Sequence, residues 1–306
     1  MIGTVLAAAT LAAAATPADA RSAYAQRQFL LDADDKCHLL GDRERAALAG
    51  SAQQARGALL RAGLKPDTIQ QAAADRAEAT PCTDQTLRVE TETARAAFSG
   101  WAARTRQEFP GEQRSWRVSR YSAEDALAWT LAQDLGDGFS IGLVEDAEQR
   151  LLAVALPVEP GAARPRTLLL EFRDPQKWPD FVDPTLGGLF AAEGQDMLAA
   201  RSAPPALSRR AWTTGPIDGS VQAPGGGADY LTWALPERTM QELAALDPRD
   251  VARVSIEYAD NRVRVLYMEI GDLAVALGFL AAGESPSTRP SASAGAATAA
   301  VDTREN

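Results

Sequence analysis

The stretch VARVSIEYADNRVRVLYMEI, residues 251–270, decides the fold of this 306-residue chain. Apolar and polar residues alternate on both sides of Asp260-Asn261, which is the pattern of two antiparallel strands joined by a tight turn. If the turn has two residues, one face of the hairpin is apolar and contains three cross-strand pairs: Val254 with Tyr267, Ile256 with Val265, and Tyr258 with Val263.

The opposite face of this hairpin is polar, and we expect it to contact solvent. It carries Arg253, Ser255, Glu257 and Arg264, with Glu257 directly across from Arg264. Because an isolated hairpin is only marginally stable in water, other segments must cover its apolar face.

Further strands are predicted upstream, at residues 139–144, 151–158, 167–173 and 230–235. Together with the hairpin they predict an antiparallel sheet of five or six strands. Before them, Ser122 begins a predicted helix that carries Leu127, Leu131 and Leu135. After the hairpin, Asp272 begins a last helix that ends at Gly283.

The first part of the chain has the periodicity of helices. Four are predicted, at about 22–40, at 42–62, after Pro66 with Ile69 and Ala73 inward, and at 84–108, with short connections that make neighbouring helices antiparallel. An acidic run, Asp32, Asp34 and Asp35, lies in the first of them and is interpreted as a solvated face, because it lacks the glycine and terminal glutamate of a calcium loop.

Cys37 and Cys82 are the only cysteines. They fall in the first helix and just before the fourth, and in an oxidising compartment they predict a disulfide that ties these helices together. A redox-active pair would more commonly be spaced as C-x-x-C.

These elements predict an α+β protein with four regions. Residues 1–20 resemble an export signal, with an apolar run, Pro17 and an Ala18-Asp19-Ala20 cleavage site. Residues 21–108 form a helical module with one disulfide, residues 116–283 an antiparallel sheet domain with flanking helices, and residues 284–306 a disordered tail. The expected location is the periplasm or the extracellular space, with no membrane insertion after signal cleavage.

Charge and motifs exclude several functions. The net charge is -10 and the pI is about 4.8, which argues against a nucleic-acid partner. The single histidine, His38, lies beside Cys37, so no triad with an imidazole base is predicted, and neither a metal site nor a cofactor motif is found. Paired carboxylates of a hydrolase remain an alternative, with four candidates: Glu171, Asp174, Glu257 and Glu269.

The long stretch 174–228 is rich in Pro and Gly and is the best candidate for a binding surface. Its aromatic residues are Trp178, Phe181, Phe190 and Trp212, which could instead cover an open face of the sheet. We therefore expect a non-catalytic protein that binds a protein or an envelope component. A protein that assembles with itself through the helical module is a third possibility.

Overall fold

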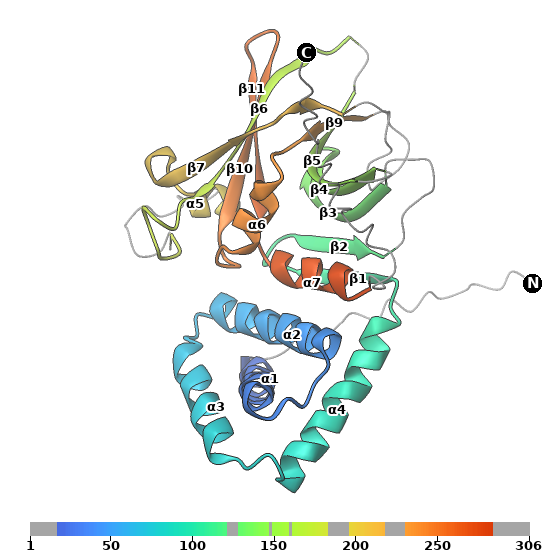
Figure 1. Ribbon diagram of the computed structural model, residues 1–306. Coiled ribbons are helices and arrows are strands. Elements are labelled where there is room, and N and C mark those ends of the chain that lie inside the picture. Colours follow the sequence, from blue (N-terminus) through green and yellow to red (C-terminus); the bar gives the residue numbers. More distant parts are fainter. Residues whose placement is uncertain are drawn as a thin grey trace, which may run out of the picture.

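The computed structural model describes residues 17–120, 128–146, 149–158, 161–182, 196–217 and 230–283. The predicted tail, 284–306, and most of the predicted export signal lie outside these residues. Within them the α+β class is confirmed, with helices first and two antiparallel sheets after them (Figure 1). The sequence had predicted a single sheet.

Four long helices form the N-terminal part: α1 (Pro17–Cys37), α2 (Asp42–Arg61), α3 (Asp67–Ala79) and α4 (Gln85–Ala102). α1 packs against α2 and α3. α1 and α2 run in opposite directions, as predicted, because Arg45 pairs with Asp34 while Arg27 donates to the carbonyl of Ser51. The predicted cleavage point after Ala20 falls in the first turn of α1, where Ala20 is buried.

The turn between α1 and α2 is built around Asp34. Its carboxylate accepts hydrogen bonds from the backbone amides of Leu39 (2.6 Å) and Leu40 (2.7 Å), and only 4% of the residue is exposed. The interpretation of the acidic run as a solvated face was therefore wrong for Asp34, although Asp35 is exposed.

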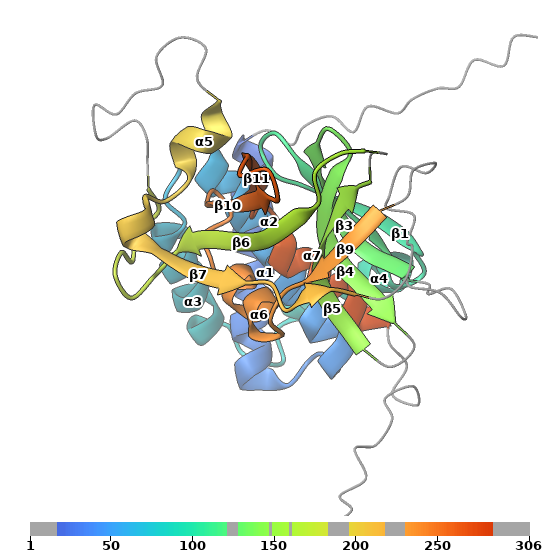
Figure 2. The same ribbon diagram turned by 90° about the horizontal axis from the view of Figure 1, so that it is seen from above.

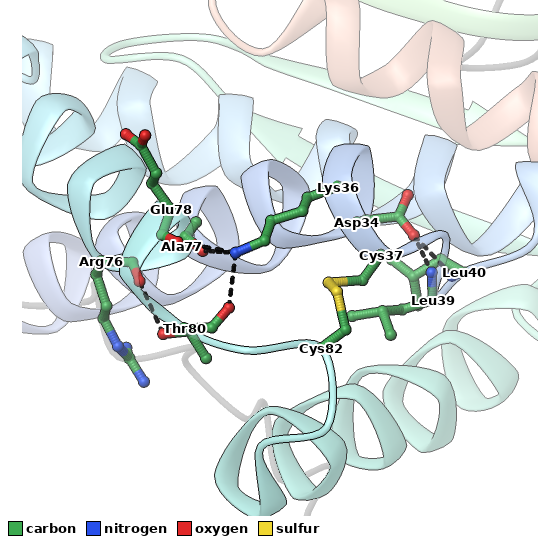
Figure 3. The surroundings of a disulfide bond; sticks show 10 residues. All are labelled: Asp34, Lys36, Cys37, Leu39, Leu40, Arg76, Ala77, Glu78, Thr80 and Cys82. Carbon is green, nitrogen blue, oxygen red and sulfur yellow. Dashed lines mark hydrogen bonds between the residues drawn. A yellow bond between two sulfur atoms is a disulfide. The ribbon is translucent and has the colours of Figure 1, made fainter.

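The disulfide between Cys37 and Cys82 is present and joins the end of α1 to the segment before α4 (Figure 3). Beside it, Lys36 Nζ donates to the last carbonyls of α3, those of Ala77 (3.3 Å), Glu78 (2.8 Å) and Thr80 (2.9 Å). A cation at a helix C-terminus stabilises carbonyls that have no partner within the helix. The disulfide and this lysine together fix α1, α3 and the start of α4.

The seven-stranded sheet has the order β1-β2-β3-β4-β5-β9-β8. Its strands are β1 (Arg106–Pro110), β2 (Ser115–Ser119), β3 (Ala128–Gly136), β4 (Phe139–Asp146), β5 (Gln149–Pro157), β8 (Gly215–Pro216) and β9 (Tyr230–Ala234). The predicted helix that begins at Ser122 was wrong over β3, because leucines four residues apart share one side of a strand as well as one face of a helix. Residues 121–127 are not described.

The four-stranded sheet has the order β11-β10-β6-β7. Its strands are β6 (Pro165–Arg173), β7 (Ser208–Trp212), β10 (Val251–Tyr258) and β11 (Val263–Glu269). The remaining helices are α5 (Met197–Arg201), a 3₁₀ turn at Pro205–Leu207, α6 (Arg238–Ala244) and α7 (Leu273–Gly283). The sequence analysis missed β1, β2, β7, β8, α5 and α6, and it extended the fourth helix into β1.

The hairpin of β10 and β11 has a three-residue loop instead of the predicted two-residue turn. Tyr258 N donates to Arg262 O at 2.9 Å, and Asn261 adopts a positive φ of 66°. This geometry is that of a type I turn followed by a left-handed residue. The pairing of β11 is consequently shifted by one residue, so that Val265 lies opposite Ser255 and Val263 opposite Glu257.

The shift reverses the two faces of β11 relative to the prediction. Leu266 and Met268 enter the core, whereas 62% of Val263 and 42% of Val265 is exposed. Arg264 contacts Asp137 in the β3–β4 turn and not Glu257. A change of one residue in register exchanges every side chain between the faces of a strand.

Both sheets contribute to one hydrophobic core, which α7 also enters. α7 lies between the sheets and α2 (Figure 1), with Arg43 Nη2 donating to Ala282 O at 2.8 Å at one end and Arg61 pairing with Asp272 at 3.1 Å at the other. The helical part is therefore held against the rest of the chain along the length of α7.

Candidate functional site

The side of the four-stranded sheet that points away from the core is open over most of its length. Successive side chains of a strand alternate between faces, so the strand registers decide which residues share this side. We call it the outer sheet face. It consists of Thr167, Leu169 and Glu171 of β6, Arg210 and Trp212 of β7, Arg253, Ser255 and Glu257 of β10, and Val263, Val265 and Tyr267 of β11.

One row of this face crosses all four strands and is mainly apolar. Val265 lies opposite Ser255, Ser255 opposite Leu169, and Leu169 opposite Trp212. Trp212 is 55% exposed and Val265 42%. Single exposed apolar side chains are common on soluble proteins, but a contiguous set of them marks an interaction surface.

The next row is charged and also crosses the sheet, in the order Tyr267, Arg253, Glu171 and Arg210. Glu171 is only 4% exposed because two arginines cover it, with Arg253 Nε at 2.9 Å and Arg210 Nε at 3.1 Å. These two charge-assisted bonds fix side chains from three strands in one arrangement. The row therefore forms a rigid polar border beside the apolar row.

One end of the outer sheet face is covered by two short segments. Arg173 pairs with Asp250 through two of its nitrogens, at 2.9 Å and 2.7 Å, and its Nη1 donates to the carbonyls of Trp178 (2.7 Å) and Pro179 (2.8 Å). This arginine holds residues 174–179 over the end of β6. α5 lies beside β10 and β11 at the same end (Figure 2), where Ser202 forms a parallel bridge with Val251.

The aromatic residues predicted as a binding surface are separated. Trp212 lies in the apolar row of the outer sheet face. Trp178, 45% exposed, belongs to the segment that covers its end, and Phe181 is half-buried beneath the guanidinium of Arg249, 4.4 Å from the ring centre. Phe190 lies outside the described residues.

The sequence analysis missed the contribution of β11 to this face. It expected Val263, Val265 and Tyr267 to point into the core, because it assumed a two-residue turn. The signal that could have corrected it is Asn261, a residue that tolerates the left-handed conformation required at the end of a three-residue hairpin loop.

The four carboxylates considered for hydrolysis all have structural partners. Glu171 pairs with two arginines, Asp174 with Arg209 (3.2 Å), and Glu257 accepts from the hydroxyl of Thr167 (3.2 Å). Glu269 is buried and accepts three backbone amide bonds from residues 112–114. Glu171 and Glu257 share the outer sheet face but lie two rows apart, about 13 Å along the strands. No observation on these residues favours an acid–base pair.

Three further features of the described residues bear on function: possible metal ligands, His38 and the length of the helices. There, no three His, Cys, Asp or Glu side chains lie close enough together to share a metal ion. His38 follows the end of α1 with a positive φ of 50° and is exposed. None of the described helices combines the length and the apolar character needed to cross a bilayer.

The function therefore has to be inferred from this geometry. Comparisons of the chain with protein families, with curated proteins and with solved structures find no match.

Proposed function

We propose that this chain is an exported, non-catalytic binding protein that receives a protein partner, or another component of the cell envelope, on the outer sheet face. The observation that carries the proposal is the row Val265, Ser255, Leu169 and Trp212, which crosses all four strands and has apolar side chains on three of them, with Val265 and Trp212 exposed. A protein that functions alone gains nothing from exposing a tryptophan and two valines on one sheet, whereas a partner would remove them from water.

The composition of the outer sheet face supports a protein partner. Tryptophan, tyrosine and arginine are the residues most enriched at the energetic centres of protein interfaces. The face carries Trp212, Tyr267, Arg210 and Arg253 within two adjacent rows. Glu171 already holds both arginines in place, so binding would order few additional side chains there.

The disulfide supports the export half of the proposal, because such bonds persist mainly in oxidising compartments. Cleavage after Ala20 would remove only the first turn of α1. We expect intact-mass spectrometry of the mature protein to show Arg21 as the first residue and two hydrogens fewer than in the reduced chain. A mature chain that retains residues 1–20 and carries two free thiols would contradict export.

Site-specific photo-crosslinking tests the binding surface directly. A benzophenone amino acid replaces Trp212 or Val265 in the full chain in the producing cell, and the matched control carries it at Val89, which is 56% exposed on α4. We expect the same covalent adduct from positions 212 and 265 and none from position 89. An adduct from position 89 alone, equal adducts from all three positions, or no adduct from position 212 would contradict the proposal.

A further inference from the structure

A second candidate site lies in the helical part, away from the outer sheet face. α1, α2 and α4, together with Phe109 of β1 and Val275 of α7, line a partly open cavity of about 400 Å³, within the range of pockets that hold small molecules. Much of its wall is apolar and consists of Leu30, Leu48, Ala94, Phe98, Trp101 and Phe109.

The cavity lies between the segments through which α4 contacts the rest of the protein. Leu87 and Thr91 in its first half are buried, and Arg95 in its middle donates to the carbonyl of Leu39. At its end, the ring of Trp101 meets that of Phe279 of α7, with centres 5.1 Å apart. Between Arg95 and Trp101, Ala97 and Phe98 of α4 line the space that separates this helix from α2.

Charges around the cavity are not balanced among the described residues. Arg27 of α1 lines it and donates Nη1 to the carbonyl of Ser51 at 2.8 Å, but no carboxylate of the described chain pairs with this guanidinium. Burial lowers the pKa of Arg27. The two carboxylates in the wall already have cationic partners: Glu44 lies 3.6 Å from Arg95, and Glu90 lies 3.0 Å from Arg76.

We propose that this cavity binds the anion of a medium-chain fatty acid, with its carboxylate on Arg27 and its chain along the apolar wall between α2 and α4. Arg27 uses Nη1 within the protein, which leaves the donors of Nε and Nη2 on one side of the guanidinium for a carboxylate. The wall of α4 extends from Glu90 to Trp101, about 16 Å at 1.5 Å per residue, which suits a single extended acyl chain.

The charge pattern selects the head group. A neutral lipid would remove water from the half-buried guanidinium of Arg27 without supplying a counter-charge, which is costly for a cation. A cationic amphiphile would face Arg27 and also Arg104, another wall residue that has no carboxylate partner in the described chain. The inference does not depend on the outer sheet face, so either proposal can fail alone.

Calorimetric titration of the full oxidised chain with dodecanoate, below its micelle concentration, tests the proposal. We expect saturable binding of one dodecanoate per chain. Arg27→Gln should weaken it at least tenfold while changing the affinity for dodecanol by less than twofold, because only the carboxylate loses a charged partner. Arg88→Gln, an exposed arginine of the same helical part, is the matched control and should leave dodecanoate binding unchanged.

A second variant tests the location of the chain. Ala94→Phe places a ring in the cavity and should abolish binding of both dodecanoate and dodecanol, with unfolding curves confirming that each variant is folded. The proposal is overturned if the unmodified protein does not bind dodecanoate, if Arg27→Gln binds it equally well, or if folded Ala94→Phe retains it. Tighter binding of a zwitterionic single-chain lipid than of dodecanoate would also overturn it.

Discussion

At the scale of single residues, Glu269 joins the two sheets. It is fully buried at the end of β11, and its carboxylate accepts the amides of Glu112 (2.6 Å), Gln113 (2.9 Å) and Arg114 (3.0 Å), which connect β1 and β2. Its backbone exchanges two further hydrogen bonds with the side chain of Gln133 in β3. A buried carboxylate requires such partners, and here they come from the other sheet.

Gly111 allows this arrangement, and its replacement provides the first prediction. A Cβ at this position would lie 2.6 Å from Glu269 Oε2 and 2.7 Å from the carbonyl oxygen of Arg114. Because neither atom can move freely, we expect Gly111→Ala to lower the free energy of unfolding by about 1–3 kcal/mol in urea denaturation.

The matched control is Gly100→Ala in α4, where a Cβ would meet no atom within 4 Å. This change should raise the free energy of unfolding by about 0.5–1 kcal/mol, because alanine favours a helix interior. If the two substitutions had the same effect, the close approach at Gly111 would be wrong.

Asp272 provides a prediction that depends on pH. The residue is 2% exposed, and burial raises its pKa to about 6, against the opposing attraction of Arg61. The folded state therefore binds this proton more tightly than the unfolded state, in which the pKa of an aspartate is near 3.9. Stability from this group is fully present below pH 4 and is lost as the pH rises through 6.

We expect the free energy of unfolding of the unmodified protein, minus that of Asp272→Asn, to fall by about 2 kcal/mol between pH 4 and pH 7. Urea denaturation of both proteins across this range measures the difference, in which contributions from other groups cancel. A difference that does not change with pH, or that rises, would show that Asp272 is ionised throughout.

At the scale of elements, helices and strands could be predicted where their own residues show a clear pattern. The registers in which the strands pair could not. The starts of α2 and α4 were predicted near Asp42 and Asp84, and Asp84 does accept the amide of Leu87 at 3.0 Å, whereas the cap of α2 is Gly41 and not the predicted Asp42. β7 was missed because its five residues alternate poorly and flank a proline-rich stretch. The register of β11 depends on the φ of Asn261, a property of three loop residues that hydrophobic patterning does not contain.

The disulfide is a predicted contact between elements that the structure confirms. It closes a loop of 45 residues between α1 and α4, and the chain-entropy model gives about 4 kcal/mol for a loop of this length. We expect a variant with Cys37→Ala and Cys82→Ala to lose about this amount of unfolding free energy in urea denaturation.

The unmodified protein treated with a reductant is the control and should match the double variant. If neither treatment changes the urea midpoint, then Lys36 and the packing of α1 on α3 hold this end of the helical part without the covalent bond.

At the scale of the whole molecule, α7 joins a helical part to two sheets that share a core, and the outer sheet face lies on the far side of that core. The sequence could predict the fold class, the polar side of β10 with Arg253, Ser255 and Glu257, and the exposure of Trp212. It could not predict the face itself, because β6, β7, β10 and β11 are brought together from three separate parts of the chain. The cavity beside Arg27 likewise depends on where α4 diverges from α2. The apolar pattern within a single helix does not predict this divergence.

The most direct test of the central claim is the affinity of the partner captured at position 212, measured for the unmodified protein, Trp212→Ala and Val89→Ala. Loss of a tryptophan from the centre of an interface costs about 2 kcal/mol, or about 30-fold in affinity. We predict a loss of this size for Trp212→Ala and an unchanged affinity for Val89→Ala, since Val89 is equally exposed but lies on α4. Equal affinities of all three proteins would contradict the outer sheet face as the binding surface.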